Sequence, residues 1–339
     1  MTLWVVRCGD GANEQEPIAK NIVGIGWSAL QDLGKITERE QIQELYTKTY
    51  TTESIAQIRT NVAQIYSFRT RIQVGDYVAL PLKKSASIAF GKVTSEYSYV
   101  KDAYNFLIHQ RKVEWIKEIP RNQIDQDLLF SFGAFLTVFQ VKRNDAEARI
   151  ETMLTGKTRP KSTYEAAIDN EDDNVVEENF DIEQFSRDQI RLLIAQKFAG
   201  HALANLVGEI MKAEGYTVQI SPAGADGGVD VLAGSGPSGF EEPTIAVQVK
   251  SGNIVIDAST LRDLKGTMQD FGASKGLVVS WSGFTSQALK DVRKSFLTIH
   301  TWNSDDIIDH LTSNWEKLPE EIRATLRLKQ IWTVLPASD

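Results

Sequence analysis

The sequence predicts two domains of different architecture: an α+β domain on a small curled or barrel-like sheet, then an α/β domain with a mixed central sheet. Three observations support this fold class. The 339 residues suffice for two ordinary domains. A strongly acidic stretch divides the chain near its middle. Strands flank an insertion of helices in the first half, whereas three strands followed by β/α alternation make up the second.

The composition is that of a globular protein, with 42% hydrophobic and 24% charged residues. No apolar run reaches the roughly 18 residues that span a bilayer. The first residues lack the basic and apolar regions of a signal peptide. Cys8 is the single cysteine, which excludes an internal disulfide and zinc sites built on several cysteines. We therefore expect a cytoplasmic protein without a membrane partner.

The net charge of −8 argues at first against nucleic acid, because DNA-binding domains are usually basic. However, Glu165–Glu183 holds nine acidic residues and no basic ones, so the rest of the chain sums to +1. This composition is typical of a solvated linker, and a tail that mimics DNA is the alternative. We expect a domain over residues 1–150, a linker over 151–186, a second domain over 187–313 and a C-terminal helix or tail over 314–339.

In the first half, β-type patterns predict five strands, with two helices between the second and the third. The strands are Leu3–Arg7, Ile22–Gly26, Asp76–Pro81, Ser87–Thr94 and Lys112–Ile119; the helices are Glu38–Thr49 and Glu53–Arg69.

The second half begins with a helical pattern over Ile190–Glu214, which Gly215 ends. Strands are expected at Tyr216–Ile220, Val229–Ala233, Thr244–Lys250, Gly276–Trp281 and Leu297–Trp302, and helices at Ser259–Phe271, after a Thr285 cap, at Asp305–Leu311 and over 314–334. Three strands followed by β/α alternation predict a mixed sheet with helices on both faces.

Chemically distinctive side chains lie on two neighbouring strands of this half. Asp230 follows a Gly-Gly pair at a strand start, and Gln248 and Lys250 alternate with valines, so they point to one side. If the strands pair, the three side chains converge on one face. Asp230 and carbonyl oxygens suit Mg²⁺, and an ammonium can position a water and offset negative charge. The alternatives are a turn cap at Asp230 and an exposed edge strand for the other two.

The string Asp226-Gly227-Gly228-Val229-Asp230-Val231, with Gln248-Val249-Lys250 following, resembles the Mrr-type catalytic domain. That domain is a branch of the PD-(D/E)xK nuclease superfamily in which Gln replaces the second acid. The resemblance covers about residues 197–312 and implies cleavage of DNA phosphodiesters with Mg²⁺, for which Mn²⁺ can substitute. It implies Asp230, Gln248 and Val249 as metal ligands and Lys250 as the catalytic lysine.

One position departs from that family, which usually carries a Glu on its first helix, two residues before a Leu-Val pair. Here the pair is Leu206-Val207 and the Glu position is Ala204. Either His201, one turn earlier, joins the catalytic site by holding a metal-bound water or a phosphate, or the helix contributes nothing to metal binding. Asp226 is either a turn residue or a second carboxylate.

Aromatic and basic side chains of the first half suit the binding of a base and its phosphates. Trp27, Tyr97 and Tyr99 offer stacking surfaces, each worth ~1–3 kcal/mol per base. Five basic residues and one acidic residue lie between Arg69 and Lys92, which predicts an electrostatic footprint for DNA. The basic residues are Arg69, Arg71, Lys83, Lys84 and Lys92. The alternatives are a core role for Trp27 and a solvated turn for the Lys83-Lys84 pair.

Three short motifs of this half resemble the PUA-like superfamily, including EVE-type domains: Trp4, Gly75-Asp76 and Gly91-Lys92-Val93. The resemblance implies a pocket for a modified or flipped base. The string Gly24-Ile25-Gly26-Trp27 resembles the N-terminal domain fused to Mrr-like nucleases.

The two resemblances together imply a modification-dependent, type IV-like DNA endonuclease that defends against foreign DNA. Its partner would be double-stranded DNA with a modified base. Because cutting both strands needs two active sites, we expect a homodimer. The alternatives are a non-cleaving nucleic-acid-binding protein, which Ala204 favours, and a nuclease effector whose first domain senses a nucleotide or RNA.

Overall fold

The computed structural model describes residues 2–8, 14–82, 85–101, 107–156, 181–222, 224 and 227–333. The described residues divide into two compact units, of which the first includes those up to Phe185 and the second those from Ser186 onward. No helix in the described ranges is both long and apolar enough to cross a membrane.

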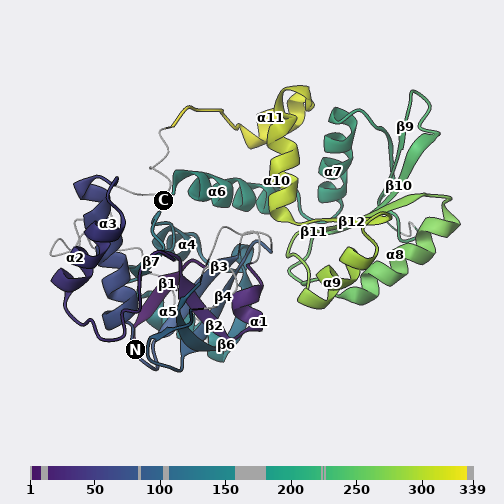
Figure 1. Ribbon diagram of the computed structural model, residues 1–339. Coiled ribbons are helices and arrows are strands. Elements are labelled where there is room, and N and C mark those ends of the chain that lie inside the picture. The colour runs from purple at the N-terminus through teal and green to yellow at the C-terminus, as the bar shows by residue number, and fades with distance from the viewer. Residues whose placement is uncertain are drawn as a thin grey trace. The chain divides into compact units, whose positions relative to one another are not determined.

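The first unit is built on a seven-stranded sheet of order β2-β6-β4-β3-β1-β7, with β5 also paired to β6 (Figure 1). Its strands are β1 (Leu3–Val6), β2 (Ile22–Ile25), β3 (Tyr77–Leu82), β4 (Ser87–Val93), β5 (Ser98–Tyr99), β6 (His109–Pro120) and β7 (Val138–Gln140). The pair β1 and β3 is parallel, and the other pairs of these strands are antiparallel.

Helices cover both faces of this sheet because the strands alternate. On β1, Trp4 packs in a core with Ile42 and Ile65, whereas Leu3 packs in a second core with Leu128. The helices are α1 (Glu16–Ala19), α2 (Arg39–Thr49), α3 (Ile55–Tyr66), α4 (Gln126–Ser131) and α5 (Ala146–Thr155), with a π-helical turn at Ser67–Arg71 and a 3-10 turn at Arg121–Gln123. The predicted α+β class and its main elements are confirmed.

The second unit contains a five-stranded sheet of order β12-β11-β10-β9-β8. Its strands are β8 (Thr217–Ile220), β9 (Val231–Ser235), β10 (Glu241–Lys250), β11 (Lys275–Ser280) and β12 (Ile299–Trp302); its helices are α6 (Ile182–Lys197), α7 (His201–Ala213), α8 (Ala258–Asp270), α9 (Ser286–Lys294), α10 (Ser304–Ser313) and α11 (Glu320–Leu326), with a 3-10 turn at Trp315–Lys317. β8, β9 and β10 are antiparallel, whereas β10, β11 and β12 are parallel, so the sheet is mixed as predicted.

Each face of this second sheet is covered by its own pair of helices. α7 and α10 lie on one side and α8 and α9 on the other (Figure 1). Val247 packs with Leu206 of α7 on the first side, and the adjacent Ala246 packs with Leu261 of α8 on the second. Because side chains alternate along a strand, Gln248 and Lys250 lie on the same side of β10 as Ala246, the side covered by α8 and α9.

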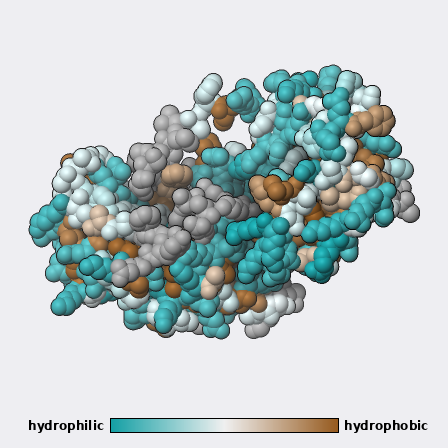
Figure 2. Space-filling view, turned by 45° about the vertical axis from the view of Figure 1, so that its right-hand side comes forward, coloured by the Kyte–Doolittle hydropathy of each residue, from teal (hydrophilic) through white to brown (hydrophobic). Residues whose placement is uncertain are grey.

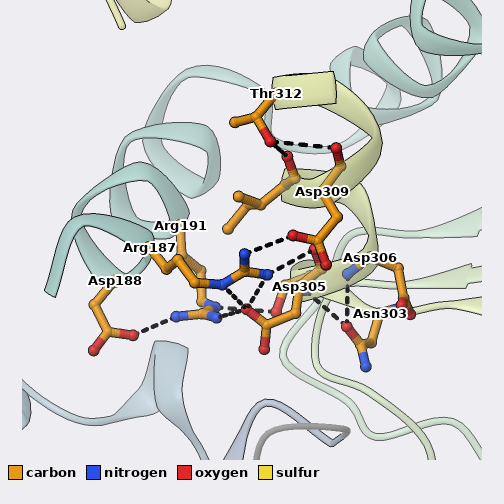
Figure 3. Close-up of polar contacts among 10 residues, drawn as sticks. Arg187, Asp188, Arg191, Asn303, Asp305, Asp306, Asp309 and Thr312 are labelled. Atoms are coloured by element: carbon orange, nitrogen blue, oxygen red, sulfur yellow. Dashed lines mark hydrogen bonds and ion pairs between the residues drawn. The ribbon is translucent and has the colours of Figure 1, made fainter. Parts of the chain in front are cut away.

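Arginines of α6 bind aspartates of α10 (Figure 3). Arg191 is 2% exposed and is paired with Asp188, 3% exposed, and with Asp305. Its Nε donates to Ser304 Oγ at 3.1 Å. Arg187 reaches Asp309 at 2.5 Å. This cluster fastens the described start of the second unit to the helix after its last strand.

Several sequence-based boundaries are wrong. The pattern over Ile190–Glu214 forms two helices, because Gly200 adopts a left-handed φ of 62° between α6 and α7. The expected terminal helix over 314–334 ends at Leu326, where Arg327 has a φ of 49°. Residues 151–155 of the expected linker belong to α5 and residues 182–186 to α6, while residues 157–180 lie outside the described ranges.

Candidate functional site

Asp230 is held at the start of β9 by both its main chain and its side chain. Its N–H donates to the Val247 carbonyl at 2.9 Å, and its own carbonyl accepts from Ser221 N at 2.9 Å. Its carboxylate Oδ2 accepts a hydrogen bond of 2.7 Å from the N–H of Val249. A charged acceptor makes such a bond stronger than a neutral one. The carboxylate is therefore fixed against the residue between Gln248 and Lys250.

The Gly227-Gly228 turn brings Asp230 to this place. Both glycines have positive φ, 64° and 87°, a conformation that other residues rarely adopt. A Cβ on Gly228 would lie 4.0 Å from Nε2 of Gln248, so the turn passes close to that side chain. The predicted tight bend before the strand is confirmed.

Gln248 carries an unusual polar atom. The side chain is half-buried, and its Oε1 is fully buried with no hydrogen-bond partner in the described part of the chain. Leaving a buried acceptor unsatisfied costs about 1–3 kcal/mol, so such an atom calls for a specific explanation. Lys250 lies on the same side of β10, exposed, opposite Ser280 in the parallel register.

The oxygen donors here fit a hard divalent cation. The Asp230 carboxylate and the unpartnered Gln248 Oε1 are the ligand types that Mg²⁺ prefers. Within the described ranges, no cluster of three His, Cys, Asp or Glu residues is arranged to hold a metal. A cation at this site would therefore depend on amide or carbonyl oxygens as well as on Asp230. Val249 uses its N–H to hold Asp230.

The first-helix candidates lie elsewhere. Ala204 is 1% exposed and packs in the core with Val247, on the side away from Gln248. His201 is the first residue of α7, and among the described residues no hydrogen bond joins it to Asp230, Gln248 or Lys250. Asp226 lies outside the described residues.

In the first unit, Tyr97 and Tyr99 converge on His109, the first residue of β6. The ring centroids are 5.9 Å and 5.5 Å from that of His109, respectively. The Tyr97 hydroxyl lies 2.7 Å from Nδ1 of His109 and accepts from Leu33 N at 3.1 Å. Burial raises the pKa of Tyr97 and lowers the pKa of His109 to about 4. Both side chains are therefore neutral at pH 7.

Arg69 joins this aromatic cluster. Its guanidinium carbon lies 5.1 Å from the centre of the Tyr97 ring, within cation–π range. Its Nε donates to the Leu33 carbonyl at 2.8 Å and its Nη2 to the Gly34 carbonyl at 2.7 Å. Arg69 thus holds the loop after Trp27 against Tyr97.

The other predicted base-binding residues of the described chain do not share the ring contacts of the Tyr97 cluster. Trp27 is half-buried, packs against the core of α2 and α3, and has a left-handed φ of 52°. The guanidinium carbon of Arg71 lies 5.7 Å from the centre of the Tyr66 ring, and the ammonium of Lys92 lies 4.9 Å from the centre of the Tyr77 ring. Lys83 and Lys84 lie outside the described residues.

β6 begins with two buried polar residues that no sequence pattern indicates. His109 and Arg111 are both fully buried. Arg111 donates to the carbonyls of Phe68 at 2.9 Å and Arg69 at 3.0 Å, which anchors the π-helical turn that carries Arg69. The strand was expected from Lys112 because the polar run His109-Gln110-Arg111 has no apolar alternation. The position of this polar run directly before an alternating strand is the one sequence signal that could extend the strand to His109.

The residues of the PUA-like motifs connect neighbouring strands of the first sheet through hydrogen bonds and close packing. Asp76 accepts from Trp4 Nε1 at 3.2 Å and from Thr2 N at 2.9 Å. Gly75 N donates to the Val93 carbonyl at 2.8 Å. At Gly91 a Cβ would lie 2.5 Å from Val113 Cγ1, so glycine permits the close approach of β4 and β6. These residues join β1, β3 and β4.

Residues 195–311 match the family model described as restriction endonuclease, Mrr_cat. The second unit carries an Mrr-type restriction endonuclease domain. This places the Asp230, Gln248 and Lys250 constellation inside a nuclease domain. Residues 4–134 match a model described as a domain of unknown function, DUF8426. No curated protein matches the chain.

Similar solved structures include two restriction enzymes and an RNA-binding domain. The DNA modification-dependent restriction endonuclease AspBHI is 13% identical, with 74% of this chain and 67% of that chain covered and a TM-score of 0.34. MspJI restriction endonuclease in complex with a 27-mer oligonucleotide is 11% identical, with 96% and 80% covered and a TM-score of 0.32. The YTH domain of Zygosaccharomyces rouxii MRB1 in complex with N6-methyladenosine RNA is 10% identical, with 48% and 91% covered and a TM-score of 0.25.

Proposed function

We propose that the protein is a modification-dependent, type IV-like DNA endonuclease that acts in defence against foreign DNA. The observation that carries this proposal is the Asp230 carboxylate held by the Val249 N–H beside the buried, unpartnered oxygen of Gln248. Lys250 extends from the same side of the strand, and the residues lie within a restriction endonuclease domain.

The catalytic roles follow from these positions. Asp230, Gln248 and the Val249 main chain would hold Mg²⁺, or Mn²⁺ in its place, which when bound polarises a phosphate and acidifies a water. The Val249 N–H orients the Asp230 carboxylate. The exposed Lys250 ammonium positions the attacking water and offsets the negative charge that develops on the phosphate. We assign no step to His201, which begins a helix on the other side of the sheet.

The first unit would select the DNA by capturing a modified base. Tyr97, Tyr99 and Trp27 supply stacking surfaces, and stacking at ~1–3 kcal/mol per base offsets the few kcal/mol that flipping costs. The Tyr97 hydroxyl is held by His109 Nδ1 and by Leu33 N, which fixes the orientation of the Tyr97 ring. Tethering this weak reader to the nuclease raises the effective concentration of the cutting site near a modified base. A homodimer would supply the second active site for the other strand.

The decisive experiment is plasmid cleavage with Mg²⁺, compared on unmodified, methylated and hydroxymethylated DNA. We expect cutting of one modified form and none in EDTA, with Lys250→Ala inactive. Trp27→Ala should equalise cutting of modified and unmodified DNA. Cutting that ignores modification in the wild type refutes the reader, and activity that survives Lys250→Ala refutes the mechanism.

A second candidate is a non-cleaving DNA-binding protein, because Ala204 is buried in the core where the family usually has a carboxylate. This function predicts intact plasmid with Mg²⁺ and with Mn²⁺. It also predicts that Asp230→Ala binds each DNA as tightly as the wild type does. Cleavage of any of the three plasmids by the wild type excludes it.

A further inference from the structure

Helices α8 and α9 expose five cationic side chains on the nuclease unit, which we term the basic surface. They are Arg262, Lys265, Lys290, Arg293 and Lys294. α8 and α9 also carry Asp263, Asp270 and Asp291, so the two helices sum to +2, whereas residues 184–339 as a whole carry three more acidic than basic residues. Much of the α8 and α9 region is hydrophilic in Figure 2.

The five cations lie on neighbouring helical positions. Arg262 and Lys265 are three residues apart on α8, and Lys290 precedes Lys294 by four on α9, spacings that place side chains on one helix face. A pocket of about 210 Å³ opens between α8, α9 and β12, and Arg262, Lys265 and Lys294 line it. Three of the five cations, together with Asp291, therefore surround a shared hollow.

Few of these charges are neutralised within the described structure. Lys294 pairs with Asp291 at 3.1 Å, and Lys265 donates to Ser295 Oγ at 2.9 Å. In the part of the chain that the structure describes, Arg262, Lys290 and Arg293 form no ion pair. Arg262 interacts electrostatically with Asp257 and Asp291 without forming an ion pair with either. Lys290 and Arg293, with Arg262, are the cations on these adjacent helices that suit an anion with closely spaced charges.

The basic surface also has a defined relation to the candidate active site. α8 and α9 cover the sheet face of Ala246 and Val278, and Gln248 and Lys250 follow Ala246 on that face. We infer that the basic surface binds the sugar-phosphate backbone of duplex DNA engaged by the nuclease unit, independently of sequence and of modification. DNA carries one charge per ~1.7 Å of helix axis, which fits several cations on one face. The choice of DNA as the ligand rests on the proposed nuclease function.

The test is DNA binding by the full chain in EDTA, which prevents cutting. The triple variant Arg262→Gln/Lys290→Gln/Arg293→Gln is compared with the wild type on an unmodified duplex between 50 and 200 mM salt, a range over which phosphate contacts are resolved. We expect the slope of log affinity against log salt to be shallower by about 3, one per lost phosphate contact. At the lowest salt we expect Kd to rise by about tenfold or more.

Two matched variants separate charge from structure. The swap Arg262→Lys/Lys290→Arg/Arg293→Lys keeps every charge and should bind like the wild type. The pair Lys197→Gln/Lys317→Gln neutralises two exposed lysines outside α8 and α9 and should also leave the slope unchanged. An unchanged slope and Kd in the triple variant, or an equal loss in the swap, overturns the inference.

The outcome is separable from that of the proposed function. If the wild type cuts no plasmid with Mg²⁺ but the triple variant loses binding, the basic surface stands and the nuclease proposal fails. If the wild type cuts while the triple variant binds normally, the nuclease stands and the basic surface does not bind DNA.

Discussion

The carboxylate of Asp230 accepts a 2.7 Å hydrogen bond from the backbone N–H of Val249. This bond joins the residue before one strand to the centre of the Gln248-Val249-Lys250 run on the next. The two strands are antiparallel neighbours with Val231 opposite Val247, so the bond extends their ladder through a side chain. A carboxylate held this way is oriented before any metal or phosphate arrives, which lowers the reorganisation needed for catalysis.

Replacing Asp230 by Asn should separate the fold from the chemistry. The amide oxygen can still accept from Val249 N, so we expect the melting temperature to stay within a few degrees. The loss of the anionic ligand should lower cleavage by ~100-fold or more. Cleavage rates with Mg²⁺ and a thermal melt measure the two effects. Activity within about tenfold of the wild type would contradict the role of Asp230.

Gln248→Leu should move stability and activity in opposite directions. It removes a buried oxygen that lacks a hydrogen-bond partner, so we expect the free energy of unfolding to rise by about 1 kcal/mol. The same change removes a proposed metal ligand and should abolish cleavage. Gln248→Glu is the matched control, because it restores an oxygen ligand and should retain cutting. Urea unfolding and plasmid cleavage measure both; a destabilised but active Leu variant is inconsistent with this interpretation.

Because His109 is buried, we expect the first unit to lose stability in acid. Burial lowers its pKa to about 4, below the ordinary 6.5, so protonation favours the unfolded chain. The stability that neutral His109 contributes is fully present above pH 6.5 and is lost as the pH falls through 4, by about 3 kcal/mol. Urea unfolding of the wild type and of His109→Gln at pH 7 and pH 4 measures this. Between pH 7 and pH 4, the free energy of unfolding of His109→Gln should fall by about 3 kcal/mol less than that of the wild type. Equal decreases in the two proteins would refute the lowered pKa of His109.

Replacing Arg191 should lower the stability of the protein much more than replacing its neighbour on α6, Arg187. Arg191→Met deprives the buried Asp188 of its arginine, and breaking a buried pair costs about 3–5 kcal/mol. Arg187→Met is the control: Arg187 is 22% exposed and pairs with Asp309, which is 59% exposed, and with Asp305, which keeps Arg191 as a partner, so its loss should cost less, about 1 kcal/mol. Urea unfolding of both variants tests this, and equal effects would show that burial of the pair does not matter.

Much of the architecture follows from local patterns. The period-two alternation of 244–250 predicts that Gln248 and Lys250 share a face, and the parallel register with β11 agrees. The Gly227-Gly228 pair predicts the bend that delivers Asp230, and both glycines have positive φ. The order of strands and helices predicts the mixed sheet of the second unit. These features depend on the backbone preferences of a few adjacent residues.

Other features depend on contacts between distant segments, which no local pattern contains. The polar run His109-Gln110-Arg111 reads as a loop, yet Arg111 is buried because the carbonyls of Phe68 and Arg69, far away in sequence, accept its N–H groups. Gly200 interrupts one helical pattern because its φ is left-handed. Ala204 faces the core rather than the Gln248 side because of how α7 packs on the sheet. The sequence alone determined the residue types and their alternation, and the tertiary structure decided which polar groups are buried, satisfied or left for a ligand, because burial is set by distant segments.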